Sequence, residues 1–157
     1  MDKTFLLEAL QKGVMNLQGQ FLNSSNYTFL TQLAYQGFEC NVVYKPVKGE
    51  MPLWDFPTGT LAQRETAAFV LSEALGWDLV PPTVFRKQAA LGPGSVQYFV
   101  EHDPQYHFFE FSVEDHQRLR PAALFDLLAN NADRKGGHVL IGAERHIYLI
   151  DHGICFN

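Results

Sequence analysis

The stretch NNADRKGGHVL, residues 130–140, is the most informative part of this sequence. It places Asp133 in a polar loop between a leucine-rich helical segment and an apolar strand, and His138 follows at the start of that strand. An aspartate in such a loop can orient a nucleophile for proton removal. An imidazole can bind a metal ion, although it suits Mn, Fe or Zn better than Mg. A loop rich in Asn, Asp and Gly also forms for conformational reasons alone, so a structural turn remains an alternative.

The second informative stretch is IYLIDHGICF, residues 147–156. Here Asp151 follows an apolar strand, and Gly153 lets the backbone turn close behind it. A carboxylate in this position suits a Mg ion that bridges phosphate groups, although it also suits a simple strand end. Residues 138–142 and 146–151 are predicted to be short strands joined by a tight turn. Asp133 and Asp151 would then flank one hairpin and face a shared site.

Lys45 provides the third feature, because it lies within the apolar stretch NVVYKPV, residues 41–47. A lysine in an apolar strand is costly unless its charge finds a partner, and the predicted helix over 60–75 offers Glu65. A strand lysine paired with a helix glutamate positions phosphates in kinases. The alternative is an edge-strand lysine that points into water, with Glu65 on a solvated helix face.

The rest of the chain predicts an α+β domain in the order β-β-β-α-β-β followed by a helix and the hairpin. The expected helices are 4–11, 60–75 and 116–130, with irregular chain over 102–114. The expected strands before the hairpin are 14–21, 27–35, 39–47, 78–86 and 95–101, with turns at 23–26 and 91–94.

Composition narrows the class of protein. Of the 157 residues, 46% are hydrophobic and 18% are charged, which is an ordinary globular balance. The net charge of −5 argues against a general nucleic-acid binder. No stretch approaches the length of a membrane span, and the N-terminal stretch carries Glu8 within its short apolar run and does not resemble a signal peptide. Cys40 and Cys155 form no CxxC pair, and we expect free thiols in a cytoplasmic protein.

These features occur in the order found in kinases: Lys45, Glu65, DRKGGH at 133–138 and DHG at 151–153. The stretches GTLAQRETAAFVLSEALGWDLVPPTV, GPGSVQYFVE and LFDLLANNADRKGGHVL closely resemble an uncharacterised bacterial family related to phosphatidylinositol 3-/4-kinases and, more distantly, to HipA-type kinases. The resemblance implies a protein-kinase-like fold. Residues 1–101 would form an N-lobe with an antiparallel sheet and one αC-type helix. Residues 102–157 would form a partial C-lobe with a helix, the catalytic loop and a β-hairpin.

The resemblance also implies a function, namely an ATP- and divalent-metal-binding phosphotransferase that acts on an unknown protein or small-molecule phosphoacceptor. Its catalytic residues would be Asp133 and Lys45, and Asp151 and His138 would bind Mg or Mn. The residues implied to bind ATP are Ser24, Ser25 and Asn26 in place of a glycine-rich loop, Lys45 and Glu65 at the phosphates, and Gln97, Phe99 and Val100 at adenine.

Three departures from the kinase pattern support a different expectation. No GxGxxG motif is present, His138 occupies a position usually held by Asn, and the chain continues for only six residues after Asp151. A pseudokinase that holds nucleotide as a scaffold without turnover is therefore the alternative, as is a truncated form of a longer kinase. A metal-dependent hydrolase that uses the histidines is a third possibility, although their spacing matches no compact zinc motif. Its ligands would be His107, His116, His138 and His152 with Asp151.

Overall fold

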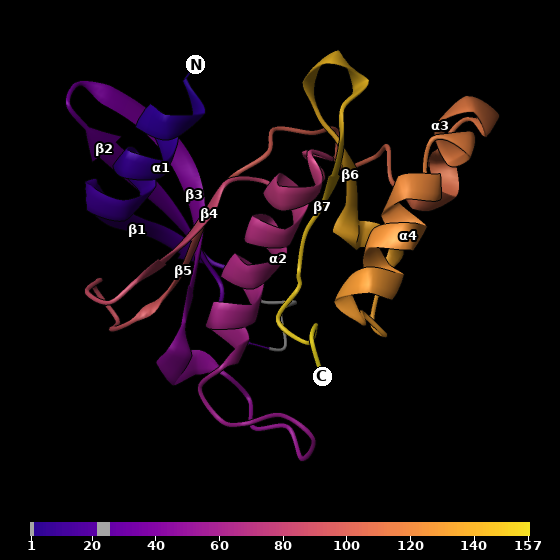
Figure 1. Ribbon diagram of the computed structural model, residues 1–157. Coiled ribbons are helices and arrows are strands. Elements are labelled where there is room, and N and C mark those ends of the chain that lie inside the picture. The colour runs from indigo at the N-terminus through magenta and orange to yellow at the C-terminus, as the bar shows by residue number, and fades with distance from the viewer. Residues whose placement is uncertain (1, 22–25) are drawn as a thin grey trace.

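The computed structural model describes residues 2–21 and 26–157. Within these residues, the main feature is a five-stranded sheet in the order β1-β2-β3-β5-β4 (Figure 1). Every neighbouring pair in this sheet is antiparallel. The strands are β1 (Val14–Gln20), β2 (Phe29–Tyr35), β3 (Phe38–Pro46), β4 (Thr83–Arg86) and β5 (Gly94–Tyr98). The predicted α+β class with an antiparallel sheet is confirmed.

Two helices cover opposite faces of this sheet (Figure 1). Successive side chains of a strand point to opposite faces, so neighbours in β3 have different surroundings. Tyr44 is fully buried against α1 (Lys3–Lys12), which contributes Leu10 to the same apolar cluster. Lys45 points to the other face and reaches Glu65 on α2 (Leu61–Leu75). β3 therefore packs Tyr44 against α1 on one face of the sheet and directs Lys45 toward α2 on the other.

Both ends of α2 are fixed by specific contacts. The Glu50 carboxylate accepts hydrogen bonds from the backbone N–H groups of Leu61 and Ala62 at 3.2 and 2.8 Å, which satisfies two donors of the first turn. Gly76 ends the helix in the left-handed conformation with φ 67°. Because α2 is held at each end, the position of Glu65 along the sheet is fixed.

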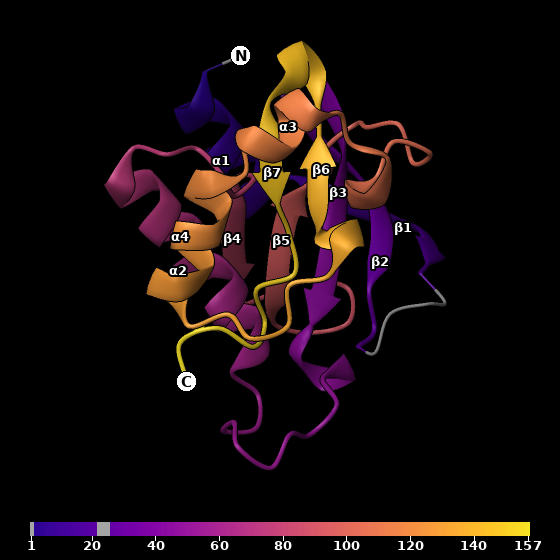
Figure 2. The same cartoon turned by 90° about the vertical axis from the view of Figure 1, so that its right-hand side faces the viewer.

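The second half of the chain packs on α2 rather than on the sheet. It contains α3 (Val113–Gln117), α4 (Arg120–Ala129) and the hairpin of β6 (Val139–Ile141) and β7 (Ile147–Leu149). Figure 2, turned so that this half faces the viewer, shows the hairpin running beside α4. Phe69 of α2, Phe125 of α4 and Leu149 of β7 meet in one buried cluster. The hairpin is also tied to the chain after α2 by the Leu149 N–H, which donates to the Leu79 carbonyl at 2.7 Å.

The structure corrects the helix predicted over 116–130, which is two helices. Gln117 ends α3, and α4 starts at Arg120 with Pro121 next to it. Proline has no N–H to donate and its ring collides with the carbonyl four residues earlier, which here belongs to Gln117. The prediction of a single continuous helix was therefore wrong, and Pro121 in the sequence already indicated a break.

Several strands are also shorter than predicted. The strand expected at 78–86 begins only at Thr83, because Pro81 and Pro82 cannot donate to a ladder. The strand expected at 95–101 is β5, which starts at Gly94 and ends at Tyr98. The last strand ends at Leu149, so Asp151 lies in the following turn with φ 63°. None of the helices in the described part of the chain has the length and apolarity that crossing a bilayer requires.

Candidate functional site

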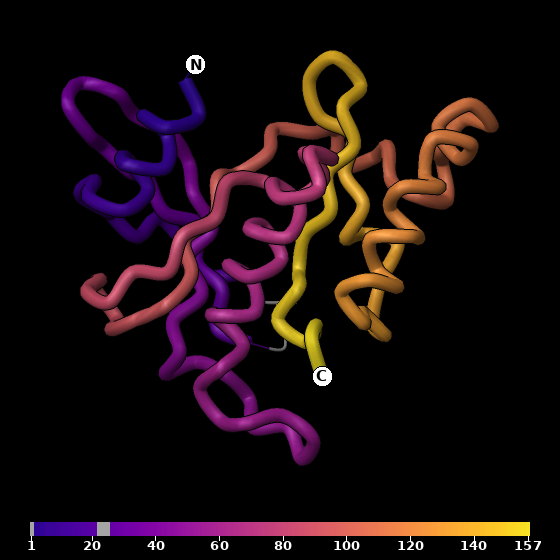
Figure 3. The backbone as a smooth tube through the Cα atoms, viewed as in Figure 1, coloured from indigo at the N-terminus to yellow at the C-terminus, as the bar shows by residue number. Residues whose placement is uncertain are grey.

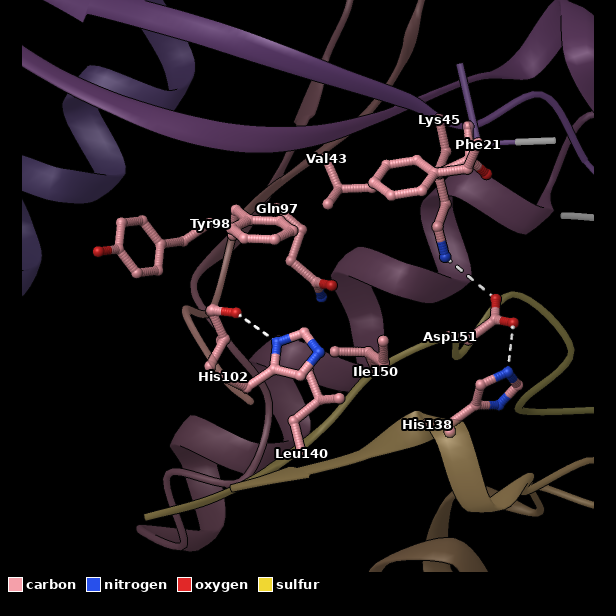
Figure 4. A pocket seen from close by; sticks show the side chains of 14 residues that line it. Phe21, Val43, Lys45, Gln97, Tyr98, His102, His138, Leu140, Ile150 and Asp151 are labelled. Carbon is pink, nitrogen blue, oxygen red and sulfur yellow. Dashed lines mark hydrogen bonds and ion pairs between the residues drawn. The ribbon is translucent and has the colours of Figure 1, made fainter. Parts of the chain in front are cut away.

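A cavity of about 370 Å³ opens between the sheet and the hairpin. Its walls come from β3, from β5 and the linker that follows it, from the start of the hairpin, and from Ile150 and Asp151 (Figure 4). These segments are far apart in the sequence and converge because α2 packs on both the sheet and the hairpin. The charged side chains of Lys45 and Asp151 lie with His138 at one end, and apolar side chains line much of the remainder, together with Gln97 and His102 (Figure 4).

At the polar end, Lys45 lies between two carboxylates. Its Nζ donates to Glu65 Oε1 and, at 3.0 Å, to Asp151 Oδ1. Burial disfavours the charged amine, but the two carboxylates outweigh this effect and raise the pKa of Lys45. Burial likewise disfavours the ionised Asp151, but Lys45 and then His138 outweigh it and lower the pKa of Asp151 to about 2. At neutral pH the site therefore holds a full positive charge and a full negative charge in direct contact.

Glu65 fixes more than the lysine. Its side chain is buried, and the residue is 3% exposed. While Oε1 accepts from Lys45, Oε2 accepts from the backbone N–H of His152 at 3.0 Å. One carboxylate thus ties β3, α2 and the turn after Asp151 together. The predicted pair of Lys45 and Glu65 is present, and it includes Asp151 as a third member.

His138 lies on the other side of Asp151. Its Nε2 is 3.2 Å from Asp151 Oδ2, whereas its Nδ1 is buried and has no hydrogen-bond partner among the residues described. Burial lowers the pKa of His138, the Asp151 carboxylate opposes this shift, and the nearby Arg134 adds to it. The ring is therefore neutral at pH 7, and Nε2 carries the proton that faces Asp151.

Arg134, beside Asp133 in the same loop, holds the loop against the turn at Asp151. Its guanidinium donates to both oxygens of Asp126 on α4 at 2.9 and 2.8 Å. It also donates to the carbonyl of Ile150 at 2.6 Å and to His152 Nε2 at 2.9 Å. Because arginine only donates, His152 accepts through Nε2. Burial, with Arg134 nearby, keeps the pKa of His152 well below its usual value, so this histidine is neutral and structural.

The structure does not bring every predicted residue into the cavity. Asp133 forms an ion pair with Lys135 at 3.0 Å, and both side chains are about half exposed. Its carboxylate is not among the described groups that line the cavity. Asn26 accepts a hydrogen bond from the Met51 N–H at 2.8 Å instead of facing the cavity. Ser24 and Ser25, the rest of the predicted phosphate-binding turn, lie outside the described residues.

The apolar end of the cavity contains the strand predicted to bind adenine. Gln97, Phe99 and Val100 all line it. The Phe99 N–H is already bonded to the Asn41 carbonyl at 3.1 Å, so this donor is not free for a ligand. Further lining residues were not predicted from the sequence, namely Phe21, Val43, His102, Leu140 and Ile150. Leu140 and Ile150 flank the predicted motifs, so the hairpin itself was a signal for them.

The described residues contain no group of three or more His, Cys, Asp and Glu side chains that could hold a metal ion. His138 and Asp151 form a pair only. His116 packs against the Phe108 ring at 5.1 Å, and His152 is bonded to Arg134, so neither joins that pair. The arrangement expected for a metal-dependent hydrolase is therefore not formed in this part of the chain.

Comparison with known proteins adds two partial similarities. No family model matches the chain. "Protein Rv2133c" of Mycobacterium tuberculosis is 38% identical in an alignment of 184 positions, gaps included, that covers 94% of this chain and 66% of that protein. Phosphatidylinositol 4-kinase gamma 4 of Oryza sativa subsp. japonica is 31% identical in an alignment of 118 positions, gaps included, that covers 62% of this chain and 20% of the kinase. The chain thus spans less than two thirds of either relative.

Proposed function

We propose that this chain is an ATP- and divalent-metal-binding phosphotransferase domain with a protein-kinase-like fold, in which residues 1–101 and 102–157 form the two sides of the nucleotide site. One observation carries the proposal. Lys45 reaches out of the sheet into a cavity of about 370 Å³ and contacts both a helix glutamate and Asp151. The partial similarity to a plant phosphatidylinositol 4-kinase supports the same conclusion.

In this proposal, Lys45 binds the phosphates of ATP. Its amine keeps its charge because Glu65 remains bonded to it, while Asp151 is a second partner whose side chain is 46% exposed. Phosphate oxygens can displace the more exposed carboxylate without breaking the buried contact. A preorganised cation at this place would stabilise the negative charge that develops during phosphoryl transfer.

Asp151 and His138 are proposed to hold the Mg or Mn ion. A carboxylate and a neutral imidazole lie 3.2 Å apart at the polar end of the cavity, and both can coordinate such an ion once the ring proton of His138 shifts from Nε2 to the unpartnered Nδ1. Two protein donors leave most positions for water and phosphate oxygens, which is the usual arrangement for Mg bound with a nucleotide. The bound ion would neutralise charge on the phosphates. The protein's own contribution is to fix the two donors through Glu65 and Arg134.

Asp133 is proposed to orient the hydroxyl group of the phosphoacceptor. It lies in the loop that leads to His138, and its side chain is about half exposed, so an incoming substrate can reach it. The acceptor is a protein or a small molecule. For Asp133 to act, its contact with Lys135 must open, which costs little because surface ion pairs contribute only about 0–1 kcal/mol.

Calorimetric titration of ATP with Mg²⁺ or Mn²⁺ tests the proposal. Lys45→Met removes the phosphate-binding cation and Asp151→Asn removes a metal-binding carboxylate, so we expect each to weaken binding at least about tenfold, the equivalent of 1.4 kcal/mol. Lys3→Met is the control, because Lys3 pairs with Glu73 and Asp78 away from the cavity. Unchanged ATP affinity in both site variants would defeat the proposal.

A nucleotide-binding scaffold without turnover is the second candidate. It is favoured by the contact between Asp133 and Lys135 and by the imidazole at position 138, which suits Mg poorly. The two candidates differ in the fate of ATP. Release or transfer of phosphate that disappears in Asp133→Ala would support the enzyme, and ATP binding with no turnover under any metal would support the scaffold.

A further inference from the structure

The inner wall of the cavity carries a glutamine whose amide orientation is fixed by a chain of hydrogen bonds. The Thr83 hydroxyl donates its proton to the Pro81 carbonyl at 2.7 Å. With that proton used, Thr83 Oγ1 accepts from Gln97 Nε2 at 2.8 Å. The amide nitrogen of Gln97 therefore points toward Thr83 and its oxygen points away. Gln97 is 5% exposed and lines the cavity.

His102, in the linker after β5, has a fixed orientation for a similar reason. Its Nδ1 lies 2.8 Å from the Val100 carbonyl, and a carbonyl only accepts, so Nδ1 carries a proton. In the neutral ring Nε2 is then an acceptor. Figure 4 shows the side chains of Gln97 and His102 directed into the same cavity. Neither Gln97 Oε1 nor His102 Nε2 accepts a hydrogen bond from the described residues.

We propose that Gln97 and His102 select the nucleobase by presenting two hydrogen-bond acceptors to an exocyclic amino group. The inference rests on the proposed ATP-binding function and adds the two side chains that distinguish adenine from other bases. A 6-aminopurine such as adenine brings two N–H donors to this end of the cavity. A 6-oxopurine brings a carbonyl oxygen, whose lone pairs would face the two acceptors.

The apolar surroundings make this selection effective. Val43, Leu140 and Ile150 line the same cavity, and these aliphatic side chains offer no hydrogen-bond donor to a mismatched carbonyl. A buried acceptor that is left without a donor costs the full free energy of removing it from water, whereas a hydrogen bond from a matched donor offsets that cost. Sites built around such hydrogen bonds discriminate against analogues that lack the matching group.

The test compares three triphosphates with the full chain at pH 8, each with Mg²⁺: ATP, GTP and inosine triphosphate. Inosine triphosphate differs from ATP only by the 6-oxo group and its ring proton. We expect ATP to bind at least about tenfold more tightly than inosine triphosphate. Gln97→Leu and His102→Phe should each lower that ratio about fivefold, because each removes one acceptor while keeping the bulk of the side chain.

Thr83→Val separates positioning from simple packing. It leaves Gln97 in place but frees its amide to turn, so the ratio of affinities should fall while the cavity lining is unchanged. Thr31→Val is the matched control, because Thr31 is buried on the opposite face of the sheet and its hydroxyl has no hydrogen-bond partner among the described residues. It should leave the ratio unaltered.

The results distinguish three claims, namely base selection, its assignment to these residues, and nucleotide binding itself. Equal binding of ATP and inosine triphosphate by the wild-type protein would overturn the base selection and leave the nucleotide site intact. A strong preference that survives in Gln97→Leu, His102→Phe and Thr83→Val alike would overturn the assignment to these residues. Failure of all three triphosphates to bind a folded protein would overturn the proposed function and this inference with it.

Discussion

Replacement of Glu65 by glutamine should destabilise the protein much more than its small chemical change suggests. The variant keeps an oxygen that can accept from the His152 N–H, but it removes the negative charge that Lys45 contacts. Loss of one partner of a buried ion pair costs about 3–5 kcal/mol, and a hydrogen bond to a charged group contributes about 1.5–3 kcal/mol. Lys45 keeps Asp151 as a partner, so we expect about 3 kcal/mol.

Thermal and urea denaturation measure this effect. For a protein of this size, 1 kcal/mol corresponds to about 2–4 °C in Tm, so Glu65→Gln should lower Tm by about 6–12 °C. The matched control is Glu73→Gln on the same helix. Glu73 pairs with Lys3, but the two side chains are 32% and 42% exposed, so the loss should stay below about 1 kcal/mol.

The comparison also separates stability from function. If the reasoning is right, ATP affinity should fall in Glu65→Gln, because Lys45 is no longer held in place, and should not change in Glu73→Gln. Equal Tm shifts in the two variants would refute the view that the buried contact between Lys45 and Glu65 stabilises the fold more than a surface ion pair does.

Three further predictions follow from the same contacts. The pKa of Asp151 is lowered to about 2, so its ionised form stabilises the fold above about pH 4, and this contribution should be lost as the pH falls toward 2. In urea unfolding at stepped pH, the free energy of unfolding should therefore fall less at acid pH in Asp151→Asn than in the wild type, and identical profiles would contradict the lowered pKa. Arg134→Lys should cost about 2–4 kcal/mol in urea unfolding, because lysine cannot contact Asp126, Ile150 and His152 at once, and a loss below about 0.5 kcal/mol would show that the loop is held otherwise. Mn²⁺ should bind tightly only together with ATP, because the described protein groups offer a pair of ligands, and stoichiometric Mn²⁺ on the nucleotide-free protein in an electron paramagnetic resonance titration would contradict this.

The sequence was most informative where local pattern and chemistry agreed. The apolar periodicity and Gly76 predicted α2 almost to its ends, and the pair of Lys45 and Glu65 followed from the cost of a lysine in an apolar strand. The direction in which Lys45 points could not be decided, because alternation fixes two faces but does not say which face meets α2. That choice depends on the burial of Tyr44 against α1, which is a tertiary contact.

Other parts of the site depend on contacts between distant segments. The pairing of Thr83 with Gln97 needs the register of β4 and β5, and no local signal gives that register. His102 faces the cavity because of the path of an irregular linker. Figure 3 shows how the C-terminal segment returns to the N-terminal end of α2, where Arg64 donates to the carbonyl groups of Cys155 and Phe156. This return was not predicted, because a chain of turns carries no periodicity.

The two-helix structure of 113–129 was predictable and was missed. The leucines suggested one helix, but Pro121 excludes a continuous hydrogen-bond ladder through this segment. For Asp133, in contrast, the side-chain contact could not be predicted from the sequence. Its place in the loop was predicted, yet its exposed contact with Lys135 reflects side-chain freedom that no sequence pattern specifies.

The central idea is that the terminal phosphates of ATP lie against the amine of Lys45. An acyl-phosphate derivative of ATP tests it directly. The raised pKa leaves only a small fraction of Lys45 as the free amine, but that fraction is held beside the mixed anhydride at high effective concentration, so it attacks the acyl carbon and releases ATP. Peptide mass spectrometry then identifies the modified lysine. We predict acylation of Lys45 that excess ATP with Mg²⁺ suppresses. Labelling of exposed lysines such as Lys135 and Lys12, unaffected by ATP and with Lys45 unmodified, would contradict the account.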